Sequence, residues 1–130
     1  MQPSTSIRGV HHVGLTVPDL AAARRFFVEA LGYQARGEKP EYPAAFVSDG
    51  KTLLSLWQVK APARTVAFDR AQNVGLHHLA LAVDGHAALD ALHARIAQRG
   101  DAEIEFAPEP LGGGSSRHMM LRIGGGLRIE

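Results

Sequence analysis

Large hydrophobic residues alternate with small or polar ones in two stretches of the chain, residues 9–17 (GVHHVGLTV) and residues 75–83 (GLHHLALAV). An apolar residue at every second position is typical of a β-strand with one buried face. The two stretches share a glycine, a pair of adjacent histidines, a leucine and a valine at matching positions. We therefore predict two copies of one strand, which indicates an internal duplication.

Each copy of this strand is followed by a stretch that predicts a helix ending at a glycine. The first helix is expected to begin after Asp19, a plausible N-cap, and to end at Gly32. The second covers the residues HAALDALHARIAQR before Gly100. Strand-like runs then follow: AAFVSDG and TLLSLWQV in the first copy, and AEIEF, RHMMLRI and LRIE in the second. Each copy therefore predicts a strand, a helix and two or three further strands.

A unit of this size is too small to bury its own sheet face, so we expect the two copies to pack against one another in a single α+β domain. Module one spans about residues 7–59 and module two about residues 74–130, with a connection at residues 60–73 that contains proline and arginine. The chain of 130 residues is long enough for one domain with a proper core.

The alternation also assigns the paired histidines to opposite faces of each strand. His11 and His77 share a face with large aliphatic residues, and we expect these two histidines at the strand's edge or in the layer that faces the helices. His12 and His78 share the other face with small residues, and small residues leave room for a pocket. His12 and His78 are therefore the candidate site residues. The alternative is that duplication copied a core histidine whose hydrogen bonds are satisfied.

The last predicted strand offers a third candidate. In the closing residues LRIE, Leu127 and Ile129 are expected to face the helices, which places Glu130 on the side of His12 and His78. Two imidazoles and a carboxylate form a facial triad, which leaves coordination positions open for water and substrate. Such a set suits divalent iron, manganese, cobalt, nickel or zinc. The spacing alone leaves a second interpretation equally open, namely that Glu130 is a solvated acid at a strand end.

Composition narrows the classes of partner and site. Lys and Arg number 14 and Asp and Glu 13, so the chain lacks the basic surface that nucleic acids or anionic membranes attract. The absence of cysteine excludes disulfides, thiolate nucleophiles and sulfur-ligated metals. The N-terminal sequence lacks the apolar run of a signal peptide, and no segment reaches membrane-spanning length. We therefore expect a soluble cytoplasmic protein.

These stretches resemble the vicinal oxygen chelate superfamily, which includes glyoxalase I, extradiol dioxygenases, and fosfomycin- and bleomycin-resistance proteins. HHVGLTVPDLAAARRFFVEALGY is similar to the opening of that family's first module, GLHHLALAVD to the opening of its second, and RIGGGLRIE to its closing strand. The resemblance covers residues 7–130. It implies two βαβββ modules paired into a cupped, barrel-like mixed sheet with helices on the outer face. It also implies a divalent metal ion in the cup, held by His12, His78 and Glu130.

The chain departs from these relatives at positions that bear on the reaction. Glyoxalase I has a glutamate ligand in the last strand of module one, which also serves as its base. The matching residue is Ser55, and serine supplies neither an anionic ligand nor a carboxylate base. Extradiol dioxygenases usually have a tyrosine where this chain has Met120, which cannot hydrogen-bond a catecholate. The usual DPDG turn is replaced by IGGG at residues 123–126.

Residues of matching parity in the last strands of the two modules are expected to line the cup. Trp57 would form an aromatic wall. His118 would be a candidate acid or base within reach of a metal-bound substrate, and Arg128 would bind an anionic group. For each of these three residues the alternative is a purely structural role, as a core residue, a strand-edge residue or a solvated side chain. The residues expected to line the substrate pocket are Leu53, Ser55, Trp57, Met120 and Arg128.

Two functions stay open on the sequence. The first is a metal-dependent enzyme that chelates a small substrate through two neighbouring oxygens, as a glyoxalase-like lyase or isomerase or as a ring-cleaving dioxygenase. The second is a metal-free protein of the bleomycin-resistance kind that sequesters a small molecule. We expect a homodimer whose modules pair within one chain or by exchange between two chains. Exchange would give each site His12 from one chain and His78 and Glu130 from the other.

Overall fold

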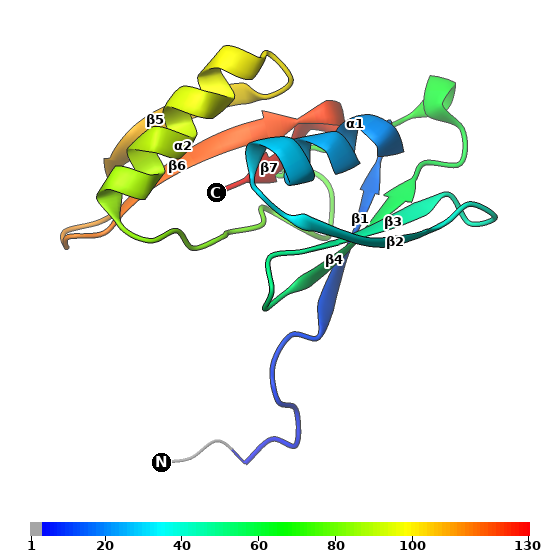
Figure 1. Cartoon of the computed structure of the whole chain (residues 1–130), viewed down its shortest axis with the longest axis horizontal. Helices are drawn as coiled ribbons and strands as arrows, with labels where there is room; N and C mark the ends of the chain where they lie inside the picture. The colour runs from blue at the N-terminus through cyan, green and yellow to red at the C-terminus, as the bar shows by residue number, and fades with distance from the viewer. Residues whose placement is uncertain (1–3) are drawn as a thin grey trace.

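The computed structural model describes residues 4–130, which form two β-sheets with two α-helices on one side of them (Figure 1). The first three residues, part of the N-terminal sequence for which we predict no signal peptide, lie outside the described residues. The α+β class expected from the sequence is therefore confirmed. The two sheets do not close into one barrel within the chain.

The first sheet has four strands in the order β1-β4-β3-β2. β1 and β4 are parallel, and the other neighbours are antiparallel, so the sheet is mixed as predicted. Asp19 caps the first helix as expected, because its side chain accepts the Ala22 N–H at 3.0 Å. The helix then widens into a π-helical turn before it ends. The elements of this half are β1 (His12–Val17), α1 (Leu20–Arg25), the π-helix η1 (Phe26–Ala30), β2 (Gln34–Lys39), β3 (Ala44–Ser48) and β4 (Leu53–Gln58).

The second sheet has three strands in the order β5-β6-β7, all antiparallel. Its helix ends at Gly100, which adopts the left-handed conformation (φ 79°) that glycine tolerates at a helix C-terminus. The connection between the two halves contains a short 3₁₀ turn, η2 (Pro62–Arg64). The remaining elements are α2 (His86–Arg99), β5 (Glu103–Pro110), β6 (Arg117–Ile123), the 3₁₀ turn η3 (Gly124–Gly126) and β7 (Leu127–Ile129).

Residues 75–83 are extended but do not form the full strand that the sequence predicts. They pair in parallel with β7 only around Leu79, which bridges Ile129. Three backbone hydrogen bonds of 2.8–3.1 Å join Leu79 and Leu81 to residues 128–130. The physical reason for the short pairing is that β7 itself has only three residues to offer. This segment nevertheless lies beside β7 as β1 lies beside β4, so the duplicated sequence gives duplicated topology.

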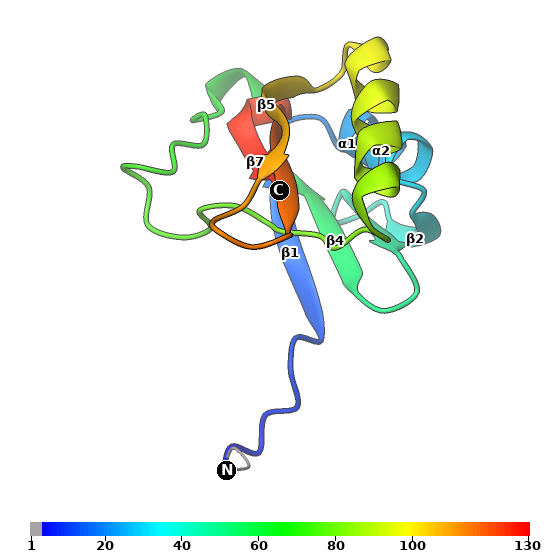
Figure 2. The ribbon, with the colours of Figure 1, turned by 90° about the vertical axis from the view of Figure 1, so that its left-hand side faces the viewer.

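One hydrophobic core joins the two halves, because the inner faces of both sheets and of both helices contribute to it. Figure 2 shows α1 and α2 on the same side of the strands. The alternation in β1 is as predicted: Leu15 and Val17 are buried, whereas His12, Gly14 and Thr16 are exposed. The buried face of α2 contributes Leu89 and Ile96, and the inner strands of the second sheet contribute Leu121 and Ile129. The outer faces of the sheets are thereby left for polar residues.

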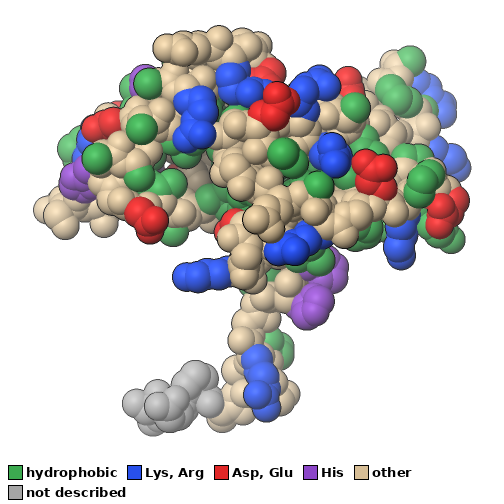
Figure 3. All heavy atoms as spheres, viewed as in Figure 1, with side chains coloured by type: hydrophobic (Ala, Val, Ile, Leu, Met, Phe, Trp, Pro, Cys, Tyr) green, Lys and Arg blue, Asp and Glu red, His purple; other side chains and the backbone are tan. Residues whose placement is uncertain are grey.

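The surface carries charges of both signs. On the face that Figure 3 shows, Lys and Arg side chains are interspersed with Asp and Glu, in keeping with the balanced composition. No helix within residues 4–130 combines the length and apolar character that crossing a bilayer requires.

Candidate metal centre

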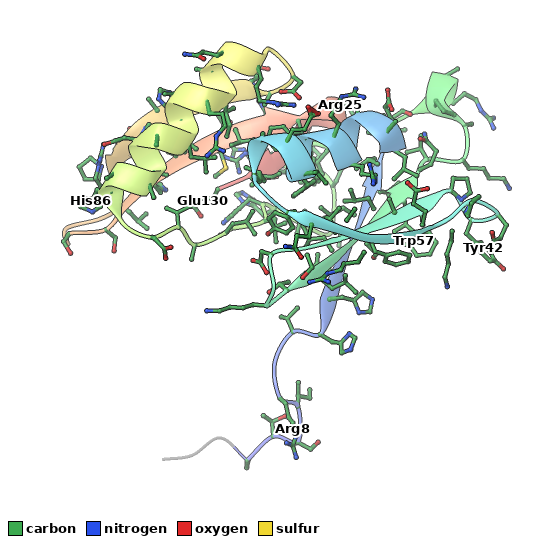
Figure 4. The ribbon with its side chains drawn as sticks, in the orientation of Figure 1. Arg8, Arg25, Tyr42, Trp57, His86 and Glu130 are labelled. Carbon is green, nitrogen blue, oxygen red and sulfur yellow. The ribbon has the colours of Figure 1, made fainter. Side chains whose placement is uncertain are left out.

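Three of the predicted site residues meet on the outer face of the second sheet. The Nε2 atom of His78 lies 3.2 Å from Oε1 of Glu130, and Nδ1 of His118 lies 2.6 Å from Oε2 of the same carboxylate. The exposed fractions of the three side chains are 35% for His78, 20% for Glu130 and 19% for His118. One carboxylate thus lies between two imidazoles at a place that is partly open to solvent. Figure 4 shows Glu130 at the C-terminal end, below α2.

The backbone fixes the position of Glu130. Its N–H donates to the Leu79 carbonyl at 2.8 Å, and its carbonyl accepts the Leu81 N–H at 2.8 Å. Leu127 and Ile129 are buried on the core side of β7, so the side chain of Glu130 extends from the opposite face. Glu130 therefore lies next to His78, on the face that the alternation in the sequence predicts.

The ring of His118 is fixed by neighbours on β5 as well as by Glu130. The aromatic ring of Phe106 lies 4.8 Å from the imidazole, centroid to centroid, in a tilted arrangement. Oε1 of Glu109 lies 3.8 Å from Nε2 of His118. The sequence predicts His118 as an acid or base near the substrate, but its contact with Glu130 was not foreseen. The signal for it is parity: on adjacent strands, His118 and Glu130 both lie on the face opposite the core.

A hollow of about 470 Å³ opens beside this cluster. It lies between α2, residues 80–83, the loop that precedes β6 and β6 itself, and both Glu130 and His118 line it. His86 at the start of α2 holds the loop, because its Nε2 lies 2.8 Å from the Ser115 carbonyl oxygen. A small molecule that enters this hollow would therefore meet the carboxylate and one of its imidazole partners.

His12 lies on the other sheet, at the start of β1, next to His11. In Figure 1 the beginning of β1 projects from the body of the chain, while the C-terminus lies against the second sheet. Within residues 4–130, no three His, Asp or Glu side chains are already arranged as a set that would hold a metal ion. A single chain thus brings together His78, Glu130 and His118, and does not add His12 to them.

Each histidine pair has the same internal geometry. In the first pair the two Nδ1 atoms lie 3.0 Å apart, and the rings meet edge to face with centroids 5.2 Å apart. In the second pair these distances are 2.8 Å and 5.0 Å. The duplication therefore extends to the contact between neighbouring side chains.

Arg128 is buried, with 7% of its surface exposed, and its guanidinium is already paired. Its Nη2 and Nε donate to Oε2 of Glu105 at 2.8 and 3.2 Å, and Nη1 lies 3.4 Å from Nδ1 of His77. The hydrogen bond from Arg128 lowers the pKa of Glu105. Partial desolvation and the Arg128 cation lower the pKa of His77. The sequence leaves Arg128 either as a binder of a substrate anion or as a solvated side chain; in the structure its guanidinium pairs with Glu105, a partner that the sequence analysis missed.

The residues predicted to line the cup from module one lie on the same face as His12. β1 and β4 are aligned so that Leu53 is beside His12, Ser55 beside Gly14 and Trp57 beside Thr16. Trp57 is 37% exposed, and its Nε1 donates to Oγ of Ser55 at 3.0 Å. A Cβ on Gly14 would lie 3.2 Å from that oxygen, so glycine is what gives the pair its room. Figure 4 shows Trp57 on the first sheet.

Two features lie apart from the predicted chemistry. Met120 is buried, and it aligns with Phe106 between β6 and β5. A larger cavity of about 670 Å³ lies in the first half between α1 and β3, and none of the predicted site residues lines it. The hollow beside Glu130 is therefore the one that carries the predicted chemistry.

Comparisons with known proteins agree with this arrangement of two modules. A sequence profile described as the Glyoxalase/Bleomycin resistance protein/Dioxygenase superfamily matches residues 9–128. The chain belongs to this superfamily. The resemblance drawn from the histidine pairs and the closing strand is thereby confirmed. A comparison with curated proteins found no match.

Solved structures of the same superfamily fold have similar lengths. A glyoxylase/bleomycin resistance protein/dioxygenase domain from Frankia sp. EAN1pec is 26% identical, with a TM-score of 0.76 and 95% of each chain covered. A lactoylglutathione lyase from Agrobacterium tumefaciens is 19% identical, with a TM-score of 0.70, and 96% of this chain and 92% of that one are covered. A fosfomycin resistance protein from Listeria monocytogenes is 17% identical, with a TM-score of 0.74 and coverages of 95% and 90%. These three structures share the fold of this chain over nearly its whole length.

Proposed function

We propose that this protein is a divalent-metal-dependent enzyme that binds a small substrate through two neighbouring oxygens. His12, His78 and Glu130 would hold the metal ion. The observation that carries the proposal is the contact between Nε2 of His78 and Oε1 of Glu130, 3.2 Å apart on the outer face of the second sheet. Superfamily membership supports the same ligand set.

The chemistry of these side chains fits a first-row divalent ion. Imidazole nitrogen and carboxylate oxygen are the ligands of facial triads, and such a triad leaves positions for substrate oxygens. The two side chains are about a third and a fifth exposed, so an ion and a substrate can reach them. The other carboxylate oxygen, Oε2, is engaged by His118, which leaves Oε1 as the atom for ligation. A bound ion would supply Lewis-acid stabilisation of negative charge on the substrate oxygens.

The residues around this centre narrow the choice of reaction class. Ser55 is buried, and its hydroxyl accepts a hydrogen bond from Trp57, so β4 offers no carboxylate base of the kind that glyoxalase I uses. With Nδ1 of His118 turned to Glu130, its Nε2 is the nitrogen left for proton transfer. We expect either a glyoxalase-like lyase or isomerase that uses His118 as acid or base, or a ring-cleaving dioxygenase. In both cases Trp57 and Leu53 would border the substrate.

A second copy of the chain is the proposed source of the missing ligand. His12 lies on the first sheet and Glu130 beside the second, so one chain presents two half-sites. A homodimer that apposes the first sheet of one copy and the second sheet of the other would complete two equivalent sites.

Metal analysis tests the proposal directly. Protein purified without chelators is expected to carry, or take up, about one divalent ion per chain. His12→Ala and Glu130→Ala should each lose that ion, whereas His93→Ala on α2 serves as a matched control and should keep it. Wild-type protein that takes up no ion in stoichiometric amount would overturn the proposal. It would favour the metal-free binding protein instead, for which Trp57, 37% exposed, offers an aromatic contact. Metal binding that survives loss of Glu130 would remove this residue from the ligand set.

Two activity assays separate the reaction classes. Oxygen consumption with catechols is expected of a ring-cleaving dioxygenase, and turnover of methylglyoxal with a thiol is expected of a glyoxalase-like enzyme. Loss of the observed activity in Glu130→Ala, with the fold retained, would assign it to this centre.

A further inference from the structure

The first histidine of each pair remains without a role in the proposed function. We propose that His77 and His11 are positioning residues: each accepts a hydrogen bond from Nδ1 of the histidine that follows it. Each would thereby present Nε2 of His78 or His12 to the metal ion. This inference rests on the proposed function, because it concerns how two of its ligands are oriented.

The repeated geometry shows that the contact is specific. The Nδ1 atoms of His77 and His78 lie 2.8 Å apart, and those of His11 and His12 lie 3.0 Å apart. The two pairs of rings meet at 76° and 81°, so both are edge to face. A contact this short between two imidazole nitrogens requires one donor and one acceptor, since two lone pairs or two N–H groups would repel. In each pair, therefore, one Nδ1 atom carries a hydrogen and the other does not.

Arg128 decides which nitrogen is the acceptor in the second pair. Its Nη1 lies 3.4 Å from Nδ1 of His77, and a guanidinium can only donate. A nitrogen that faces a donating cation must offer its lone pair, so Nδ1 of His77 carries no hydrogen. Nδ1 of His78 must then carry the hydrogen and donate it to His77. Glu105 holds the buried Arg128 in place through two hydrogen bonds, so the preference originates in the ion pair between these two side chains.

This tautomer has a direct consequence for Nε2 of His78. In a neutral imidazole the second nitrogen then carries a lone pair, and that lone pair faces Oε1 of Glu130 at 3.2 Å. Two acceptors face one another there, and a bound cation held by His78 and Glu130 would satisfy both. Metal-binding histidines commonly donate their other N–H to a fixed acceptor, which sets the ring orientation. His77 provides that acceptor for His78, and the equivalent geometry assigns the same role to His11 for His12.

The test combines a spectroscopic and a binding measurement on three variants of the full chain. His77→Leu removes the acceptor, His77→Asn restores an acceptor oxygen near the position of Nδ1, and His93→Leu is the control for losing a histidine. NMR of the imidazole nitrogens reports which nitrogen of His78 carries hydrogen, without metal and with Zn²⁺. Competition with a chelator gives the affinity for Zn²⁺ and Co²⁺, and the Co²⁺ absorption spectrum reports the coordination geometry.

We expect wild-type His78 to carry hydrogen on Nδ1, and His77→Leu to lose that signal and to bind the ion about 10- to 100-fold more weakly. His77→Asn should recover most of the affinity and the wild-type Co²⁺ spectrum, and His93→Leu should match wild type. An Nδ1 of His78 that is unprotonated in wild type, or His77→Leu with unchanged affinity, would overturn the inference. If wild type binds no ion at all, the proposed function fails, while the protonation of His78 without metal still decides the orientation.

Discussion

At the scale of single residues, the orientation of Glu130 depends on contacts that no sequence pattern reveals. Its backbone is held on both sides by Leu79 and Leu81, and each oxygen of its carboxylate faces a different imidazole. Such a carboxylate has little freedom to rotate, so the atom offered to a ligand is chosen before the ligand arrives. In a facial triad this preorganisation decides whether the carboxylate binds through one oxygen or two.

Removing His118 tests this arrangement. In His118→Leu the Oε2 atom of Glu130 loses its 2.6 Å partner, so the carboxylate can turn and bind through both oxygens or swing away. We expect metal affinity to fall about 10- to 100-fold, as for other groups that orient a ligand. Chelator competition measures the loss, and urea unfolding of both proteins shows whether the fold is retained.

His118→Asn is the matched variant, since its amide N–H can replace the Nδ1 donor. It should bind the metal ion more tightly than His118→Leu does, even where an activity that needs the imidazole is lost in both. Equal affinities for wild type and His118→Leu would mean that Glu130 is oriented by its backbone alone.

At the scale of elements, the turn between β3 and β4 positions Ser55 and Trp57, and Asp49 holds that turn. Its Oδ1 accepts the backbone N–H groups of Lys51 and Thr52 at 2.9 and 2.8 Å. The hydrogen bond from the Thr52 N–H, followed by that from Lys51, lowers the pKa of Asp49. Burial first, and then the Asp49 charge, raise the pKa of the neighbouring Tyr33 to about 12.

The sign of the pH dependence at this turn follows from the lowered pKa. A carboxyl whose pKa is lower in the folded state stabilises the fold above its unfolded pKa of about 3.9, and that stabilisation is lost as the pH falls through the folded value. Asp49→Ala should reduce the free energy of unfolding by about 1 kcal/mol near neutral pH, because two hydrogen bonds of a largely exposed group are lost. The difference from wild type should shrink as the pH falls below the unfolded pKa of about 3.9. Urea unfolding at several pH values measures it.

Asp49→Asn separates the two contributions, because it keeps an acceptor oxygen and removes the charge. It should be more stable than Asp49→Ala, with a smaller pH dependence than wild type. A constant difference between wild type and Asp49→Ala at every pH would show that the charge contributes nothing.

Much of this element structure could be predicted, because the spacing of apolar residues and the residues that end a helix or strand are local properties of the sequence. Gly100 ends α2, and RHMMLRI forms β6 at residues 117–123, as expected. The strand predicted over residues 75–83 is longer than the pairing that the structure shows, because the three residues of β7 limit that pairing. The length of β7 cannot be inferred from the alternation within residues 75–83. Parity placed Glu130 with His78. It could not foresee that Glu105 pairs with Arg128 or that His118 contacts Glu130, because those contacts depend on side-chain positions across strands.

At the scale of the whole molecule, the two half-sites predict an outcome that a single-chain site does not allow. His12→Ala retains His78 and Glu130, and Glu130→Ala retains His12. If each site takes His12 from one chain and His78 and Glu130 from its partner, each variant alone has no complete site. A dimer of one chain of each kind then contains one complete site and one site that lacks two ligands. Random exchange makes half of the dimers mixed, so about a quarter of the wild-type metal content should return.

The experiment mixes equal amounts of the two variants under conditions that allow chains to exchange, and measures bound metal after free ion is removed. Each variant mixed with itself is the control for non-specific uptake, and a mixture of His12→Ala with His78→Ala should also recover about a quarter, because His78 and Glu130 lie on the same chain. His78→Ala mixed with Glu130→Ala should recover nothing, because neither chain keeps both residues of the second half-site. Recovery in that last mixture would contradict the shared placement of His78 and Glu130. Failure to recover in the first two, with dimers present and wild type loaded, would place His12 in the same chain's site or outside the ligand set.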